Sequence, residues 1–276
     1  MKLKASFLYQ ILDLRWALLI YYFVILCLTL LANITIVSFS SASSVGVVGE
    51  NDTIVMSGIT FSSAIFIFIV SLNSFTENFR FSLQNGVSRK TLFLARLCTA
   101  GATSLFMAVV DQVIHVLISL VEEPLSHLVS IPLFQLIYPQ TFENPVLGFF
   151  LSVVFSFCLL LFISNVGYAI VMMFYRVGKL GKVLLGAGIP AALVFGIPAI
   201  KAFDTLYFGE RLRAFGNAVI SPILDFAFNT VPNRMISLLL LAALFALFDW
   251  LLLRRATIRW TSLVHYPKQV LAAQGP

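Results

Sequence analysis

Two ionisable residues lie close together inside a long apolar segment of the sequence. Asp111 and His115 are four residues apart, so a helix would place both side chains on one face. Asp111 comes about ten residues before the end of its segment, which puts it about 15 Å deep in a membrane-spanning helix. A carboxylate at that depth is costly unless a neighbour compensates it. The pair is therefore either a polar spot in a translocation path or a polar link between helices, with Asn73, Asn165 and Ser164 as candidate partners.

Catalysis by this pair would need groups that the sequence does not supply. An intramembrane hydrolase uses a second carboxylate, a nucleophile with a positioned base, or a set of metal ligands. The apolar segments contain no H-E-x-x-H, no G-x-S-x-G and no second aspartate paired with Asp111. We therefore expect no catalytic residues and no metal site, and an intramembrane enzyme is the least favoured function class.

The second stretch of interest lies between two apolar segments. The run Gln84–Gly86 reads Gln-Asn-Gly, which is a turn signal, and Ser88 is a suitable N-cap for the helix that follows. Arg89 and Lys90 add positive charge at the membrane surface. Such a capped turn would join two helices rigidly and transmit force from a docked partner to both. An ordinary basic loop explains the same residues, and spacing alone does not separate the two interpretations.

The composition identifies the class of protein that positions these residues. The chain has 276 residues, of which 60% are hydrophobic and only 11% are charged, and its mean hydropathy is +0.98. A soluble globular domain carries roughly 25% charged residues. The sequence therefore predicts an all-α, polytopic membrane protein with one transmembrane domain, residues 1–260, and a cytoplasmic tail, residues 261–276. The six predicted spans are residues 16–38, 58–75, 92–121, 145–175, 183–200 and 235–253.

The basic residues indicate how the chain is oriented. Of the eighteen Lys and Arg residues, only Lys201, Arg211, Arg213 and Arg234 fall in predicted outer loops. Positive charge concentrates on the cytoplasmic side of membrane proteins, so both termini should be cytoplasmic. The same distribution argues against nucleic acid as a partner, because the charges follow the ends of the spans and form no single basic face.

Three further segments should lie along the membrane surface. Residues Lys2–Arg15 carry apolar side chains at helical spacing, which predicts an amphipathic elbow helix before the first span. Leu128–Phe142 and Ala214–Phe228 are apolar, but they are too short to cross a membrane and contain proline. We expect interfacial or re-entrant pieces there. The loop Lys201–Arg234 should form short extracellular helices before the sixth span.

These features together resemble a known family, the permease subunits of ABC-2 type exporters. The resemblance rests on six spans with both termini inside, the elbow helix, and the run from Leu83 to Thr91 after the second span. In that family a similar run marks the coupling helix, which docks on the nucleotide-binding ATPase subunit. By resemblance, the docking residues of this chain are Glu77, Arg80, Leu83, Gln84, Asn85, Gly86, Val87, Ser88, Arg89 and Lys90.

The resemblance implies a half-transporter. Two permeases, either two copies of this chain or this chain and a sister permease, would pair with two ATPase subunits that bind ATP and Mg²⁺. These 276 residues contain no G-x-x-x-x-G-K-[ST] motif, so the energy should come from another polypeptide. The chain itself should bind no cofactor.

The leading hypothesis is a bacterial plasma-membrane exporter of a hydrophobic or amphipathic substrate. A small peptide, such as a toxin, a bacteriocin or an antimicrobial peptide, is the favoured cargo. The alternative is an ATP-independent transporter or channel, for which one chain would need a complete polar path of its own. Stable association with an ATPase separates the two hypotheses.

Overall fold

The described part of the structure is almost entirely helical. The computed structural model describes residues 2–42, 54–56, 58–122, 128–130, 132–138, 145–178, 181–182, 186, 218 and 230–254. Its elements in chain order are α1 (Lys2–Ala42), β1 (Ile54–Met56), α2 (Gly58–Gln84), α3 (Arg89–Glu122), β2 (Leu128–Ser130), α4 (Leu133–Ile137), α5 (Pro145–Arg176) and α10 (Val231–Arg254). The two strands have only three residues each, so the all-α class expected from the sequence holds.

Five of the helices are long and apolar enough to cross a membrane. They coincide with the first four predicted spans and the sixth. The candidate spans are Leu3–Thr29, Gly58–Phe75, Arg89–Ser119, Val146–Arg176 and Val231–Arg254. The fifth predicted span, residues 183–200, lies outside the described residues apart from residue 186. Nearly all of the predicted outer loop 201–234 and the tail 261–276 also lie outside them.

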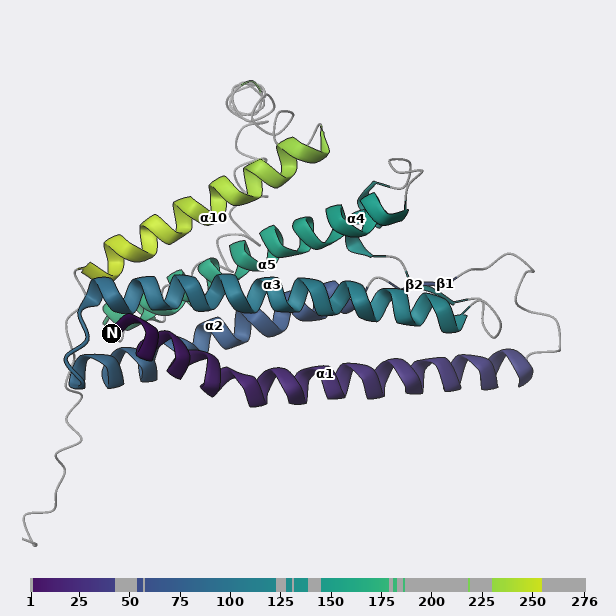
Figure 1. The fold of residues 1–276 in the computed structure, drawn as a ribbon, viewed down its shortest axis with the longest axis horizontal. Coiled ribbons are helices and arrows are strands. Elements are labelled where there is room, and N and C mark those ends of the chain that lie inside the picture. The colour runs from purple at the N-terminus through teal and green to yellow at the C-terminus, as the bar shows by residue number, and fades with distance from the viewer. Residues whose placement is uncertain are drawn as a thin grey trace, which may run out of the picture.

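Helix α5 occupies the centre of the bundle. It packs against α2, α3, α4 and α10, whereas α1 packs mainly on α3. In Figure 1 the N-terminus, the α2–α3 turn and the C-terminal ends of α5 and α10 lie at one end of the bundle, and the two strands lie at the other. Helix α5 ends and α10 begins at opposite ends of the bundle.

The elbow helix expected at Lys2–Arg15 is part of a longer helix. Helix α1 is continuous over 41 residues, and its ribbon changes direction after the first turns (Figure 1). The structure therefore shows a bent α1 in which no break separates a surface helix from a span. Whether the first turns lie along a membrane surface stays a prediction.

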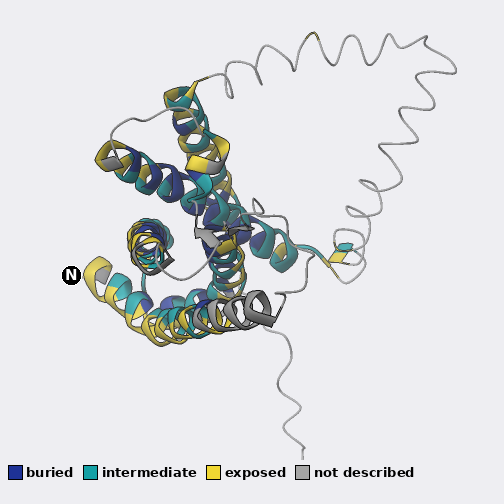
Figure 2. Ribbon diagram, turned by 90° about the vertical axis from the view of Figure 1, so that its right-hand side faces the viewer, coloured by how far each residue is buried: buried dark blue, intermediate teal, exposed yellow. Residues whose placement is uncertain are grey.

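Buried residues gather where α2, α3 and α5 meet, and α1 is exposed along most of its length (Figure 2). One apolar cluster has Ile67, Met107 and Leu160 at its core. By contrast, Trp16 and Phe23 on α1 are 63% and 69% exposed. Large exposed apolar side chains are what a helix facing lipid requires, because the bilayer interior does not penalise them.

One glycine allows α5 to approach α2 closely. A Cβ atom added at Gly167 would lie 3.0 Å from the Phe68 carbonyl oxygen and 3.0 Å from Ser71 Cβ. Small residues at such crossings bring helix backbones together in membranes, where packing replaces the hydrophobic effect as the source of association. This contact helps to fix how α2 lies against the central helix.

The segment between α3 and α5 does not form a span in its described residues. The predicted interfacial piece Leu128–Phe142 contains β2 and the five-residue helix α4. Strand β2 pairs in parallel with β1, with Ile54 opposite Leu128. This small sheet links the start of α2 to the end of α3.

Candidate functional site

The turn between α2 and α3 is closed by a glycine in the left-handed region. Gly86 has a φ angle of 65°. The Val87 N–H donates to the Ser82 carbonyl at 2.9 Å, and the Gly86 N–H donates to the Leu83 carbonyl at 3.1 Å. This pair of bonds forms a Schellman motif, which ends a helix on a residue that glycine suits best. The turn predicted at Gln84–Gly86 is thus where α2 ends.

The helix after the turn begins as the sequence predicts. The Thr91 N–H donates to Ser88 Oγ at 3.2 Å, which makes Ser88 the N-cap of α3. Arg89 Nη1 donates to the Arg254 carbonyl at 2.7 Å, so the start of α3 is tied to the last residue of α10. Bonds to the last carbonyls of a helix satisfy acceptors that have no partner within the helix.

Aromatic and aliphatic packing braces this end of the bundle. The rings of Tyr9 on α1 and Phe81 on α2 stack with their centroids 4.6 Å apart. Phe79, Leu92 and Leu253 belong to one buried apolar cluster shared by α2, α3, α5 and α10. A displacement of the α2–α3 turn would therefore be transmitted through these contacts to all five long helices.

The predicted docking residues divide into an exposed tip and its supports. Glu77 and Arg80 belong to α2, and their side chains lie outside the described part of the structure. Leu83, Val87 and Arg89 are partly buried. The exposed residues at the tip are Gln84, Asn85, Gly86, Ser88 and Lys90. The tip is polar and accessible, as a docking surface would have to be.

Asp111 is buried and connects three helices. Its side chain is 0% exposed. Its Oδ1 atom accepts hydrogen bonds from Ser63 Oγ of α2 at 2.9 Å and from Tyr22 Oη of α1 at 3.0 Å. Tyr21 Oη and Ser63 Oγ are also bonded, at 2.9 Å. Helices α1, α2 and α3 thus meet at a single carboxylate.

The other polar residues predicted to join Asp111 lie elsewhere. His115 is buried one turn further along α3, with 2% of its side chain exposed. Asn165 Nδ2 donates to the Ala242 carbonyl at 3.2 Å and so links α5 to α10. Asn73 and Ser164 line a separate cavity. The partners of Asp111 are instead Tyr22 and Ser63, hydroxyl residues that the sequence interpretation did not single out.

The most buried cation in the described part of the chain is Arg96. Its side chain is only 8% exposed. Arg96 Nη2 donates to Ser71 Oγ at 3.0 Å and to Ser164 Oγ at 2.9 Å, and the guanidinium carbon lies 4.9 Å from the centre of the Tyr168 ring. Burial of a charge without a counter-ion costs several kcal/mol.

No carboxylate among the described residues lies within ion-pair distance of Arg96. Its Nε atom is buried and makes no hydrogen bond within that part of the chain. Asp249 on α10, itself 2% exposed, interacts with Arg96 electrostatically without touching it. The Arg96 charge is therefore stabilised only by two hydroxyls, an aromatic face and a distant acid. An anion could still bind to it directly.

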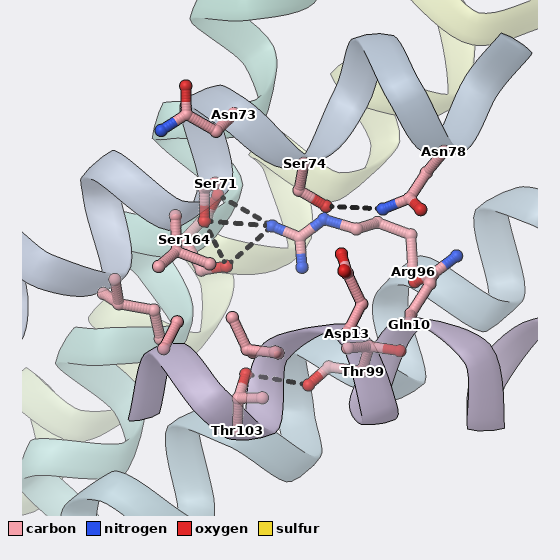
Figure 3. Close-up of a pocket in the computed structure, with 14 residues that line it drawn as sticks. Gln10, Asp13, Ser71, Asn73, Ser74, Asn78, Arg96, Thr99, Thr103 and Ser164 are labelled. Atoms are coloured by element: carbon pink, nitrogen blue, oxygen red, sulfur yellow. Dashed lines mark hydrogen bonds between the residues drawn. The ribbon is translucent and has the colours of Figure 1, made fainter. Parts of the chain in front are cut away.

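Arg96 lies at the wall of a cavity between α1, α2, α3 and α5. The cavity has a volume of about 230 Å³. Figure 3 shows Gln10 and Asp13 of α1 pointing into it from the side opposite Ser71 and Ser164, with Arg96 between. This arrangement can bind a charged, hydrogen-bonding solute. The sequence did carry one signal for it, because Arg96 falls inside the predicted span 92–121 and not before it.

Comparison of this chain with protein-family models, with curated proteins and with solved structures finds no match in any of the three.

Proposed function

We propose that this chain is the membrane-spanning permease subunit of an ATP-driven exporter. A separate ATPase subunit, present in two copies, would bind ATP and Mg²⁺ and dock on the α2–α3 turn. A second permease, identical or a sister chain, would complete the transporter in a bacterial plasma membrane. The favoured substrate is a hydrophobic or amphipathic molecule, in particular a small toxin, bacteriocin or antimicrobial peptide.

The observation that carries this proposal is the construction of the α2–α3 turn. It presents an exposed polar tip, it is held by a Schellman motif and an N-cap, and Arg89 bonds it to the end of α10. A flexible loop would absorb the displacement of a docked partner, whereas a capped turn with bonded neighbours passes it to the helices. Force transmission from an ATPase needs the second kind of structure.

An apolar cavity agrees with the favoured cargo. Its volume is about 550 Å³, and α3, α5 and α10 line it with residues that include Leu97, Leu161 and Trp250. A volume within the ~300–1,000 Å³ range of ligand pockets accommodates a bulky apolar side chain or acyl group.

Purification of the chain from its native membrane in mild detergent tests the proposal. Mass spectrometry of the purified material should find a P-loop ATPase in a one-to-one ratio with the permease. The variant Arg89→Ala should insert normally and retain the ATPase less well, because it loses the bond to α10, while Arg15→Ala serves as the control for loss of an arginine at the same end of the bundle. Reproducible absence of an ATPase from a folded preparation would overturn the proposal.

A second candidate is an ATP-independent transporter of a small polar solute. The specific observation in its favour is the cavity around Arg96, which lies within a single chain. Transport of a labelled solute by the chain alone in ATP-free vesicles would separate this candidate from the exporter.

A further inference from the structure

The cavity beside Arg96 contains a positive charge whose binding capacity is only partly used. Within the described residues, all hydrogen bonds of the guanidinium come from Nη2. The Nε atom has no hydrogen-bond partner there, and neither does the Oε1 atom of Gln10, which is 5% exposed and lines the same cavity. Buried polar atoms normally have partners. Both residues line this one cavity, and the Nη1 atom of Arg96 also makes no hydrogen bond within the described residues, so the guanidinium has donors left for a polar ligand there.

The charges around the cavity indicate the kind of ligand. Arg96 presents a fork of N–H donors, which matches an anionic group such as a carboxylate. Asp13 presents an exposed carboxylate from the opposite wall (Figure 3). A second negative charge on the ligand would be repelled by Asp13, whereas an ammonium group would be attracted. The two walls together favour a zwitterion over a simple anion.

The remaining lining sets the size and polarity of the ligand. Leu14, Ile67 and Val70 form an apolar part of the wall, and Asn73 and Asn78 add amide groups. The volume of about 230 Å³ is below that of a site for a drug-sized molecule. The space suits a compact solute with a short apolar side chain between its charged ends and the helices.

We infer that this cavity binds a small zwitterion of the amino-acid class, with its anionic group on Arg96, its ammonium group toward Asp13 and its apolar part against α1 and α2. The same pairing of an anion with an ammonium occurs in a free amino acid and in an ethanolamine lipid headgroup, so the test includes both. The inference goes beyond the proposed function and does not depend on it, because it requires only binding by the isolated chain.

Ligand-dependent thermal stabilisation of the purified chain in phosphatidylcholine nanodiscs tests the inference. The probes are L-leucine, 4-methylpentanoate without the amino group, leucinamide without the carboxylate, and the phosphodiester sn-glycero-3-phosphoethanolamine. L-Leucine should bind about tenfold or more tightly than either truncated probe, because each probe loses one charge-assisted interaction. Stabilisation by sn-glycero-3-phosphoethanolamine alone would keep the zwitterion site and assign it to a lipid headgroup.

Two variants connect binding to the named residues. Arg96→Gln should melt at the same or a higher temperature without ligand, because it removes a buried charge that lacks a counter-ion, and it should lose all stabilisation by L-leucine. Asp13→Asn should fold normally and lose only the preference for L-leucine over 4-methylpentanoate. Arg15→Gln, which removes an exposed cation from outside the cavity, is the matched control and should bind like the unmodified chain.

Three results would overturn the inference. The first is no stabilisation by any zwitterion. The second is equal, non-zero stabilisation by L-leucine and 4-methylpentanoate in the unmodified chain. The third is a ligand-free Asp13→Asn variant that melts at a clearly lower temperature, because Asp13 would then be the internal counter-ion of Arg96. If Arg96→Gln does not fold, the probe series and Asp13→Asn still decide the question.

Discussion

At the scale of single residues, hydroxyl groups provide the hydrogen bonds of the ionisable side chains buried inside the bundle. Asp111 accepts two hydrogen bonds from hydroxyls, and Arg96 donates to two others. A hydroxyl can donate to a carboxylate and accept from a guanidinium, so serine and tyrosine serve both charges. Each network takes its members from helices that are far apart in the sequence, and each therefore fixes helix packing as well as charge.

The network around Asp111 predicts a difference between two substitutions. Asp111→Ala removes the acceptor used by Ser63 and Tyr22, and it should lower the stability of the chain by about 1–2 kcal/mol. Asp111→Asn keeps an oxygen acceptor and removes a buried charge, so its stability should stay within about 0.5 kcal/mol of the unmodified chain. Thermal unfolding in nanodiscs measures both effects.

The control for this pair is Ser119→Ala, because the Ser119 hydroxyl bonds only a carbonyl of its own helix, that of Val116 at 2.8 Å. It should have little effect. If Asp111→Asn unfolds as easily as Asp111→Ala, the charge itself matters and the packing explanation is wrong. If Asp111→Asn is stable but transports poorly, Asp111 belongs to the translocation path.

At the scale of the elements, helix ends and close crossings decide how the spans lie. The sequence places a turn at Asn85 and Gly86, and the structure adds the reason that it is rigid, namely the Schellman bonds and the bond from Arg89 to α10. The crossing of α2 and α5 depends on Gly167, whose missing side chain leaves room for the Phe68 backbone. Both features rest on glycine, for different physical reasons.

Gly86→Ala tests whether the left-handed backbone of Gly86 is needed to keep the turn rigid. Alanine in the left-handed region costs about 1–2 kcal/mol, so the α2–α3 turn should loosen and exchange of the two Schellman amides, those of residue 86 and Val87, should accelerate. Gly178→Ala is the matched control, because Gly178 is also exposed beyond a helix end but has no positive φ and has open space around it. Equal exchange in the two variants would show that the Schellman motif does not hold the turn.

Gly167→Ala tests whether the missing side chain of Gly167 is needed for the close crossing of α2 and α5. The added methyl group would meet backbone at 3.0 Å, so α2 and α5 must separate, and the stability should fall by about 1–3 kcal/mol. Gly101→Ala, also inside a helix but with nothing within 4 Å of the new atom, should be neutral or slightly stabilising. A neutral result for Gly167→Ala would mean that the crossing of α2 and α5 accommodates the extra atom.

At the scale of the whole molecule, charge and topology agree. The described helix ends that carry several basic residues, including Arg89, Lys90, Arg176 and Arg254, lie at one end of the bundle, and Arg234 lies toward the other. A membrane protein with this asymmetry should keep the basic end in the cytoplasm.

Cysteine labelling tests this orientation. In a background without Cys27, Cys98 and Cys158, the variant Asn85→Cys in intact cells should resist a membrane-impermeant maleimide, and Thr230→Cys should react with it. Both positions are exposed, so lysed cells should label at both and provide the control. The reverse pattern in intact cells would invert the topology and remove the α2–α3 turn from the reach of a cytoplasmic ATPase.

The class of the protein and the positions of its described helices follow from local properties of the chain. Apolar runs of the required length mark five spans. The helices α3, α5 and α10 begin and end within about four residues of the predicted bounds, whereas α1 is longer at both ends and α2 continues nine residues beyond its predicted end at residue 75. The turn at Gly86 and the cap at Ser88 were also predictable, because their hydrogen bonds reach only to residues within five positions along the chain.

The polar networks were not predictable in this way. Ser71 and Ser164 are 93 residues apart in the chain and meet on Arg96 only because α2, α3 and α5 pack together. Likewise, Tyr22 and Ser63 reach Asp111 across helix interfaces. The predicted partner Asn165 instead bonds the Ala242 carbonyl, and Asn73 lines the cavity beside Arg96. Hydropathy is a property of each segment, but a buried hydrogen bond depends on the rotation of each helix about its axis, which only packing against neighbours determines.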